Sequence, residues 1–85
     1  MITDFVQTFL EEDPDYFKLS HKDRDVTLEI YKIVMRAVMR VVEYENVFPI
    51  VLASDSRSAN LIQEALNKIK PIIPQVSNVK IRIVN

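Results

Sequence analysis

The chain has 85 residues, of which 48% are hydrophobic and 27% are charged, and its formal net charge at pH 7 is −1. This composition is typical of one small globular domain and excludes an intrinsically disordered chain. The chain contains no cysteine, which excludes a disulfide scaffold and a cysteine-ligated zinc site. A net charge near zero provides no overall electrostatic attraction for nucleic acid.

The hydropathy of the chain argues against a membrane protein. Its longest apolar run, residues 47–53, is far shorter than the about 20 residues that cross a bilayer. The N-terminus carries acidic residues where a secretory signal has a basic region. We therefore expect a cytoplasmic protein with no membrane partner.

Residues 1–20 are expected to form a short helix, ended by Pro14, and then a small apolar cluster that plugs the end of the next helix. The carboxylates around the proline invite a cation-site interpretation, and they are Glu11, Glu12, Asp13 and Asp15. A calcium loop alternates its ligands and turns at a glycine, and this chain has no glycine. We therefore expect no metal site here.

His21 is the only histidine, and it lies in a charged stretch just before the long helix. A histidine beside aspartates can act in acid-base or metal chemistry. In a charged entry to a helix it is more commonly a surface or capping residue, which is the interpretation we adopt. We assign no catalytic residue, expect no cofactor, and do not favour an enzyme.

Residues 23–46 are predicted to form one long helix, which Asp23 or Asp25 can cap. Its apolar residues follow the spacing of three and four that marks a buried helical face. A helix of this length measures about 33 Å, which matches the diameter of about 31 Å expected for the whole globule. One helix is therefore expected to span the domain.

A second apolar stripe on this helix exceeds what a small layer can cover. It comprises Leu28, Tyr31, Met35, Met39 and Val42. We expect these residues to form an interface with a second copy of the chain, as a homodimer or a larger assembly. The alternative is that the N-terminal helix and the C-terminal unit enclose the long helix within one chain.

Residues 47–85 are predicted to form a strand, a helix and a second strand. The first strand, in residues 47–53, is continuously apolar, which is typical of a strand buried on both faces. In the second strand, Val79, Ile81 and Ile83 alternate with Lys80 and Arg82, which indicates one wet face. A strand-helix-strand unit pairs its strands in parallel, and a two-stranded sheet is marginal alone. We therefore expect an α/β (α+β) fold with a small parallel sheet that oligomerisation completes. The alternative is that the sheet stays small and the long helix forms the dimer.

The loop between the first strand and its helix is the best candidate for a small-ligand site. Its residues are Ser54, Asp55, Ser56, Arg57 and Ser58. The loop enters a helix N-terminus, where free amides favour an anion such as phosphate, and a guanidinium adds a charged donor. The alternative is that Asp55, Ser56 or Ser58 only caps the helix and Arg57 is solvated.

The function we favour from sequence is a small, non-enzymatic, homo-oligomeric adaptor or regulator that acts through protein contacts. One alternative is a nucleic-acid-associated accessory protein that uses basic residues, although the net charge makes nucleic acid an unfavoured partner. These basic residues are either Lys32, Arg36 and Arg40 on the long helix or Lys68, Lys70, Lys80 and Arg82 near the C-terminus. The other alternative is a protein that binds a small ligand or phosphate at residues 54–58.

Overall fold

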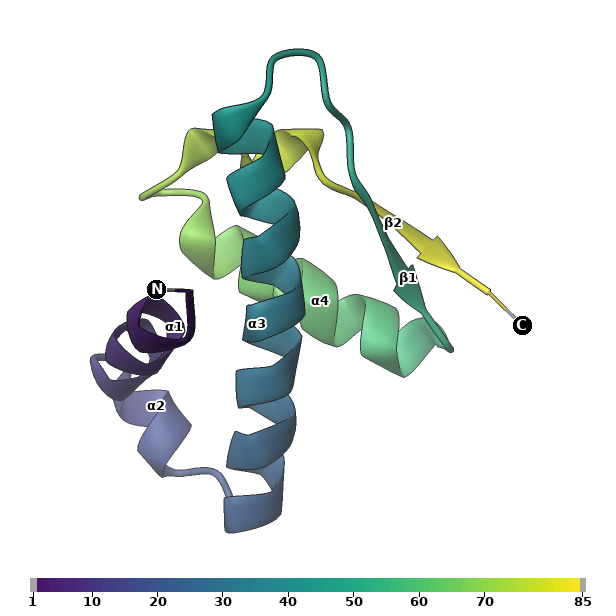
Figure 1. The fold of residues 1–85 in the computed structure, drawn as a ribbon. Coiled ribbons are helices and arrows are strands. Elements are labelled where there is room, and N and C mark those ends of the chain that lie inside the picture. The colour runs from purple at the N-terminus through teal and green to yellow at the C-terminus, as the bar shows by residue number, and fades with distance from the viewer. Residues whose placement is uncertain (1, 85) are drawn as a thin grey trace.

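The computed structural model describes the backbone of residues 2–84 and the side chains of residues 4–84. A long helix runs through the middle of the molecule, with two short helices on one side of it, the two strands on the other and another helix crossing behind it (Figure 1). The elements in chain order are α1 (Ile2–Glu11), α2 (Pro14–Phe17), α3 (His21–Glu43), β1 (Ile50–Ala53), α4 (Ser56–Ile69), the 3₁₀ helix η1 (Pro74–Asn78) and β2 (Lys80–Ile83). The predicted α+β fold with a small parallel sheet is confirmed.

The long helix α3 begins and ends slightly earlier than predicted. Ser20 caps it, because its hydroxyl accepts a hydrogen bond of 3.2 Å from the Asp23 amide. Asp23 and Asp25 therefore lie inside the first turns and not at the cap. The 23 residues of α3 measure about 34 Å, close to the longest dimension of the molecule, 37 Å.

The helices α1 and α2 cover one side of α3. Val6 and Leu10 of α1 are fully buried, and the ring centroids of Phe9 and Tyr31 lie 5.8 Å apart. Tyr16 of α2 is buried as expected for a plug, whereas its neighbour Phe17 is exposed. The N-terminal segment thus closes this side of the core within the chain.

The C-terminal unit pairs β1 with β2 in parallel, as predicted. Ile50 lies beside Lys80, and Leu52 lies beside Arg82. The prediction that the first strand is buried on both faces is wrong, because burial alternates along β1: Val51 and Ala53 are buried, whereas Ile50 and Leu52 are exposed. The apolar run is continuous because one face of β1 joins the core while the other remains apolar at the surface.

The turn between α3 and β1 contains a residue with left-handed backbone geometry. Asn46 has φ 60°, and it is the one residue of the described chain recorded with a positive φ. This region is usually occupied by glycine and, among other residues, is best tolerated by asparagine. The turn therefore depends on the one residue of 43–49 that accepts this geometry readily.

Candidate interaction surface

In the loop at residues 54–58, Asp55 is the N-cap of α4. The Asp55 carboxylate accepts a hydrogen bond of 2.8 Å from the Ser58 amide. Hydrogen bonds from Ser58 hold the pKa of Asp55 below its usual range, so this carboxylate is ionised at neutral pH. A fixed negative charge lies where an incoming anion would meet the amides.

The other residues of this loop form no further binding arrangement. Ser54, Ser56 and Arg57 are exposed, and Ser58 is partly buried. The guanidinium of Arg57 forms no hydrogen bond or ion pair with the other described residues. The geometry therefore favours the capping interpretation, and ligand binding by this loop stays a prediction.

The five residues predicted as an interface are divided between the core and the surface. Tyr31 and Met35 are buried in the hydrophobic core, while Leu28 and Met39 are partly buried against it. Val42, near the end of α3, is exposed. The helix α1 packs against α3, and its Phe9 contacts Tyr31. The burial of Tyr31 and Met35 agrees with the alternative that the chain encloses the long helix itself. A partner has no access to these two side chains in the folded protein.

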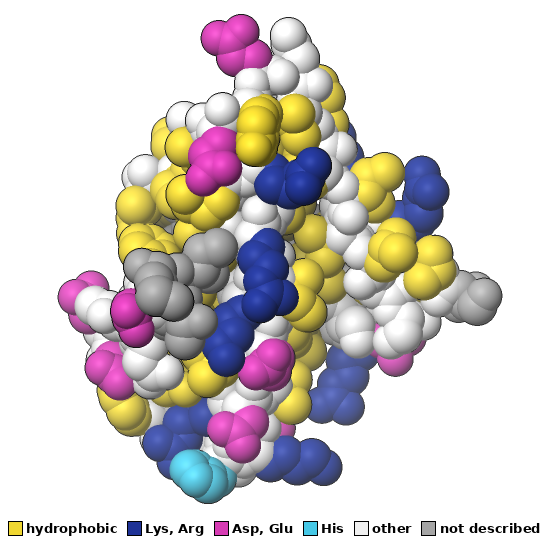
Figure 2. Space-filling model, viewed as in Figure 1, with side chains coloured by type: hydrophobic (Ala, Val, Ile, Leu, Met, Phe, Trp, Pro, Cys, Tyr) yellow, Lys and Arg dark blue, Asp and Glu magenta, His cyan; other side chains and the backbone are white. Residues whose placement is uncertain are grey.

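The open apolar surface lies on the opposite side of α3, toward β1. Val26 and Ile33 of α3 are 44% and 48% exposed, and Leu52 of β1 is 60% exposed. These three side chains line an open groove of about 560 Å³, whose floor includes Ile30, Ala53, Leu61 and Ile62. Figure 2 shows hydrophobic side chains over the region between α3 and the sheet. Sequence spacing alone does not reveal this groove, because Val26 and Ile33 follow the same three-and-four spacing as the buried residues of α3.

The groove continues onto the outer face of the sheet. Phe48, Ile50 and Leu52 alternate along the chain and are all exposed. Beside them on β2, the side chains of Lys80 and Arg82 are exposed at the paired positions. Since alternate residues share a face, the outer face of the sheet is apolar along β1 and basic along β2.

The rim of the groove on α3 carries the opposite charge. Asp25 and Glu29 line the groove, and Glu29 forms an exposed ion pair of 3.3 Å with Lys32. Across the apolar surface from them lie Lys80 and Arg82. The apolar surface therefore lies between two acidic residues of α3 and two basic residues of β2.

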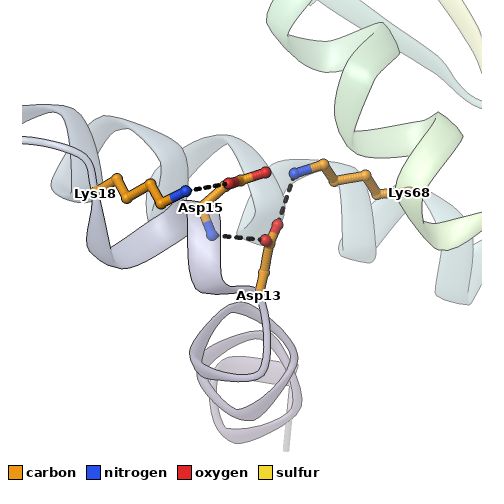
Figure 3. Close-up of polar contacts among 4 residues, drawn as sticks. All are labelled: Asp13, Asp15, Lys18 and Lys68. Carbon is orange, nitrogen blue, oxygen red and sulfur yellow. Dashed lines mark hydrogen bonds and ion pairs between the residues drawn. The ribbon is translucent and has the colours of Figure 1, made fainter.

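A second pocket, of about 200 Å³, lies where α2, α3 and α4 meet. Lys68 of α4 reaches the carboxylate of Asp13 at 2.6 Å, and Asp15 pairs with Lys18 at 3.5 Å (Figure 3). The hydrogen bond lowers the pKa of Asp13 and raises the pKa of Lys68, and burial raises the pKa of Tyr31. The pair joins positions 55 residues apart. The sequence signal for it is the charge of the two ends: residues 1–15 carry acidic and no basic side chains, and residues 65–85 carry basic and no acidic ones.

The basic residues considered for nucleic-acid binding are distributed over several surfaces. Basic side chains follow the exposed side of α3 (Figure 2), where Arg36 and Arg40 are exposed and Lys32 pairs with Glu29. Lys68 is engaged with Asp13. Lys70 lies at the end of α4, apart from the stripe on α3. These residues do not form one continuous basic track.

Comparison of the chain with models of protein families, with curated proteins and with solved structures gave no match. Within residues 2–84, none of the helices has the length and apolarity required to cross a membrane. The described residues also contain no group of three or more His, Asp or Glu side chains placed to hold a metal ion.

Proposed function

We propose that this protein is a non-enzymatic interaction module that self-associates through the groove between α3 and β1. The observation that carries the proposal is the exposure of Val26, Ile33 and Leu52 around one groove. Contiguous exposed apolar surface with a polar rim is characteristic of protein interaction sites. An adaptor or regulatory role would then follow from the surfaces that remain exposed in the assembly.

The charge distribution supports a second copy of the chain as the occupant of the groove. In a two-fold dimer the same surface meets itself, so the two sides of each surface exchange places. A two-fold axis through the apolar middle would bring Asp25 and Glu29 of one copy toward Lys80 and Arg82 of the other. Exposed ion pairs contribute only about 0–1 kcal/mol each, so they would orient the dimer while apolar burial stabilises it.

The small size of the sheet supports the same proposal. A two-stranded sheet with one uncovered apolar face is marginal in water. Packing a second copy against Phe48, Ile50 and Leu52 removes that face from solvent, at about 25 cal/mol for each Å² of apolar surface buried. A cover over this face therefore stabilises both the sheet and the assembly.

Light scattering after size-exclusion chromatography tests the proposal. The expected mass of the wild-type protein is that of a dimer, twice the chain mass of 9.9 kDa. Ile33→Glu and Leu52→Glu should each give a monomer with an unchanged circular-dichroism spectrum, because the new carboxylate lies in the proposed interface and in water when monomeric. A wild-type monomer at tens of micromolar would contradict the proposal.

The matched control is Ile72→Glu. Ile72 is 58% exposed, close to the value for Leu52, but it follows α4 away from the groove. This variant should remain dimeric. If all three variants dissociate equally, the groove is not the interface.

A further inference from the structure

The strand β2 has an unpaired edge. It is the outermost strand of the sheet (Figure 1), and it pairs with β1 alone. The Lys80 amide donates to the Pro49 carbonyl at 2.9 Å, and the Val84 amide donates to the Ala53 carbonyl at 2.8 Å. Because backbone groups alternate in direction along a strand, Ile81 and Ile83 direct their N–H and C=O groups to the open side.

The two faces of this edge have different chemistry. Lys80 and Arg82 are exposed on the outer face, and neither forms an ion pair with any described residue. On the face toward α4, Ile81 is partly buried against the core and Ile83 is 46% exposed. Residues 65–84 contain no acidic side chain that could neutralise the basic face.

A cleft of about 380 Å³ lies beside the start of β2 on the side that α4 covers. Its lining is mixed, with polar residues that include Gln63, Asn67, Lys70 and Lys80 and apolar residues that include Leu66 and Ile81. Side chains of a strand added to β2 would project alternately toward this side and toward the outer face. The cleft therefore provides space for one of the two side-chain rows of such a strand.

The charges of β2 disfavour the pairing of this edge with its own copy. An antiparallel pair of β2 strands related by a two-fold axis normal to the sheet would place Lys80 and Arg82 of both copies on one face. Like charges opposite each other across strands are destabilising, and lysine on an edge strand is a common protection against self-pairing. The same charges attract a strand that carries carboxylates at alternate positions.

We propose that β2 binds an extended acidic segment of another protein as an added third strand. Ile81 and Ile83 provide the main-chain hydrogen bonds, and Lys80 and Arg82 select acidic side chains on the outer face. On the α4 side, the side chains of Ile81 and Ile83 favour apolar neighbours. Main-chain bonds give affinity in this mode, and the alternate side chains give specificity. The edge shares Lys80 and Arg82 with the proposed dimer contact, but its main-chain groups lie outside the groove, so the inference does not rest on the proposed self-association.

The probe is a fluorescein-labelled peptide of about eight alternating Glu and Val residues with blocked termini. This length spans the four-residue edge of β2. Binding is followed by fluorescence anisotropy with the Ile33→Glu variant, so that self-association cannot compete for Lys80 and Arg82. We expect saturable binding. A peptide with Lys in place of Glu should not bind, and absence of binding by the Glu peptide overturns the proposal.

Two further comparisons separate strand addition from simple charge attraction. Methylating the peptide amides that would face β2 should weaken binding about tenfold or more, because it removes the main-chain donors. Arg82→Glu should weaken binding to a similar extent, whereas Lys22→Glu, an exposed site at the start of α3, should have no effect. Equal binding of the methylated and unmethylated peptides, or an equal effect of the two protein variants, contradicts the proposal.

Amide hydrogen exchange gives an independent test. In the complex, Ile81 and Ile83 should become protected, while the amides of Lys80 and Val84, already bonded to β1, should change little. Protection confined to other segments would place the peptide elsewhere and overturn the inference.

Discussion

The two sides of α3 differ in how completely the chain covers them. On the side of α1, Tyr31 and Met35 are buried, and Lys68 reaches across to Asp13 to connect α4 with the N-terminal segment. On the side of β1, Val26 and Ile33 remain about half exposed above an open groove. The same helix thus has one side that contributes to folding and one that is available for association, although both are apolar in sequence.

The largest expected effect comes from placing a charge on the covered side. Met35 is 3% exposed, and Met35→Glu should prevent folding, because an unpaired buried carboxylate is strongly unfavourable. Ile33→Glu, two residues away on the open side, should keep a native spectrum. Circular dichroism and thermal melting compare the two, and a folded Met35→Glu variant would contradict the burial described for α3.

A matched pair of leucines measures the same difference without a charge. Leu10 of α1 is 2% exposed, and Leu10→Ala should lower the free energy of unfolding by about 2–5 kcal/mol through loss of burial and creation of a cavity. Leu52→Ala should change it by no more than about 0.5 kcal/mol. Both are measured by urea denaturation in the Ile33→Glu background, so that association does not contribute. Equal costs would mean that the groove is closed in solution.

The third prediction concerns the start of α4, beside the groove. Asp55→Ala should lower the melting temperature, because the Ser58 amide loses its acceptor. The depressed pKa of Asp55 means that its stabilising contribution is present above the ordinary value of about 3.9 and is lost as the pH falls below it. Arg57→Ala should have no effect on melting. A silent Asp55→Ala, or a destabilising Arg57→Ala, would contradict the capping interpretation.

The smallest expected effect is that of the Asp13–Lys68 pair on the covered side. Asp13→Asn removes the charge but keeps a side-chain acceptor for the Asp15 amide. It should lower the free energy of unfolding by less than about 1 kcal/mol at neutral pH, because the pair is partly solvated. The coupling in a double-mutant cycle with Lys68→Gln should be lost as the pH falls below about 4, since the pKa of Asp13 is depressed. A coupling that does not change with pH would show that the pair contributes through packing.

The sequence predicted the elements well and their mutual arrangement less well. The spacing of α3 and α4, the parallel strands and Asp55 as one of three candidate caps are confirmed by the structure. The side of α3 that remains open was not predictable, because helical spacing identifies apolar stripes but does not show which neighbour covers each stripe. Likewise, Ile50 and Leu52 look buried in a continuous apolar run, and only the placement of α3 and α4 shows that one face of β1 is left uncovered.

The same limit applies to the candidate site. Residues 54–58 were selected because they follow a strand and precede a helix, and the structure places them there, with the anion position taken by Asp55. The groove and the Asp13–Lys68 pair join residues distant in sequence, and local spacing does not encode such contacts. The open edge of β2 exists because the sheet contains only two strands. The sequence predicts the two strands but does not show that no third strand covers this edge.

The turn at Asn46 is one example of a property of the whole chain, the lack of glycine, which affects the entropy of the unfolded state. It reverses direction without glycine, and the chain contains none. A chain of this length with the usual share of glycine, near 7%, would contain about six, and each glycine adds about 0.4–1 kcal/mol of conformational entropy that folding must overcome. The unfolded state is therefore disfavoured by about 2–6 kcal/mol relative to such a chain, a quantity comparable with the entire stability of a small domain. A restricted unfolded ensemble allows this short chain to fold while much of its apolar surface remains outside the core.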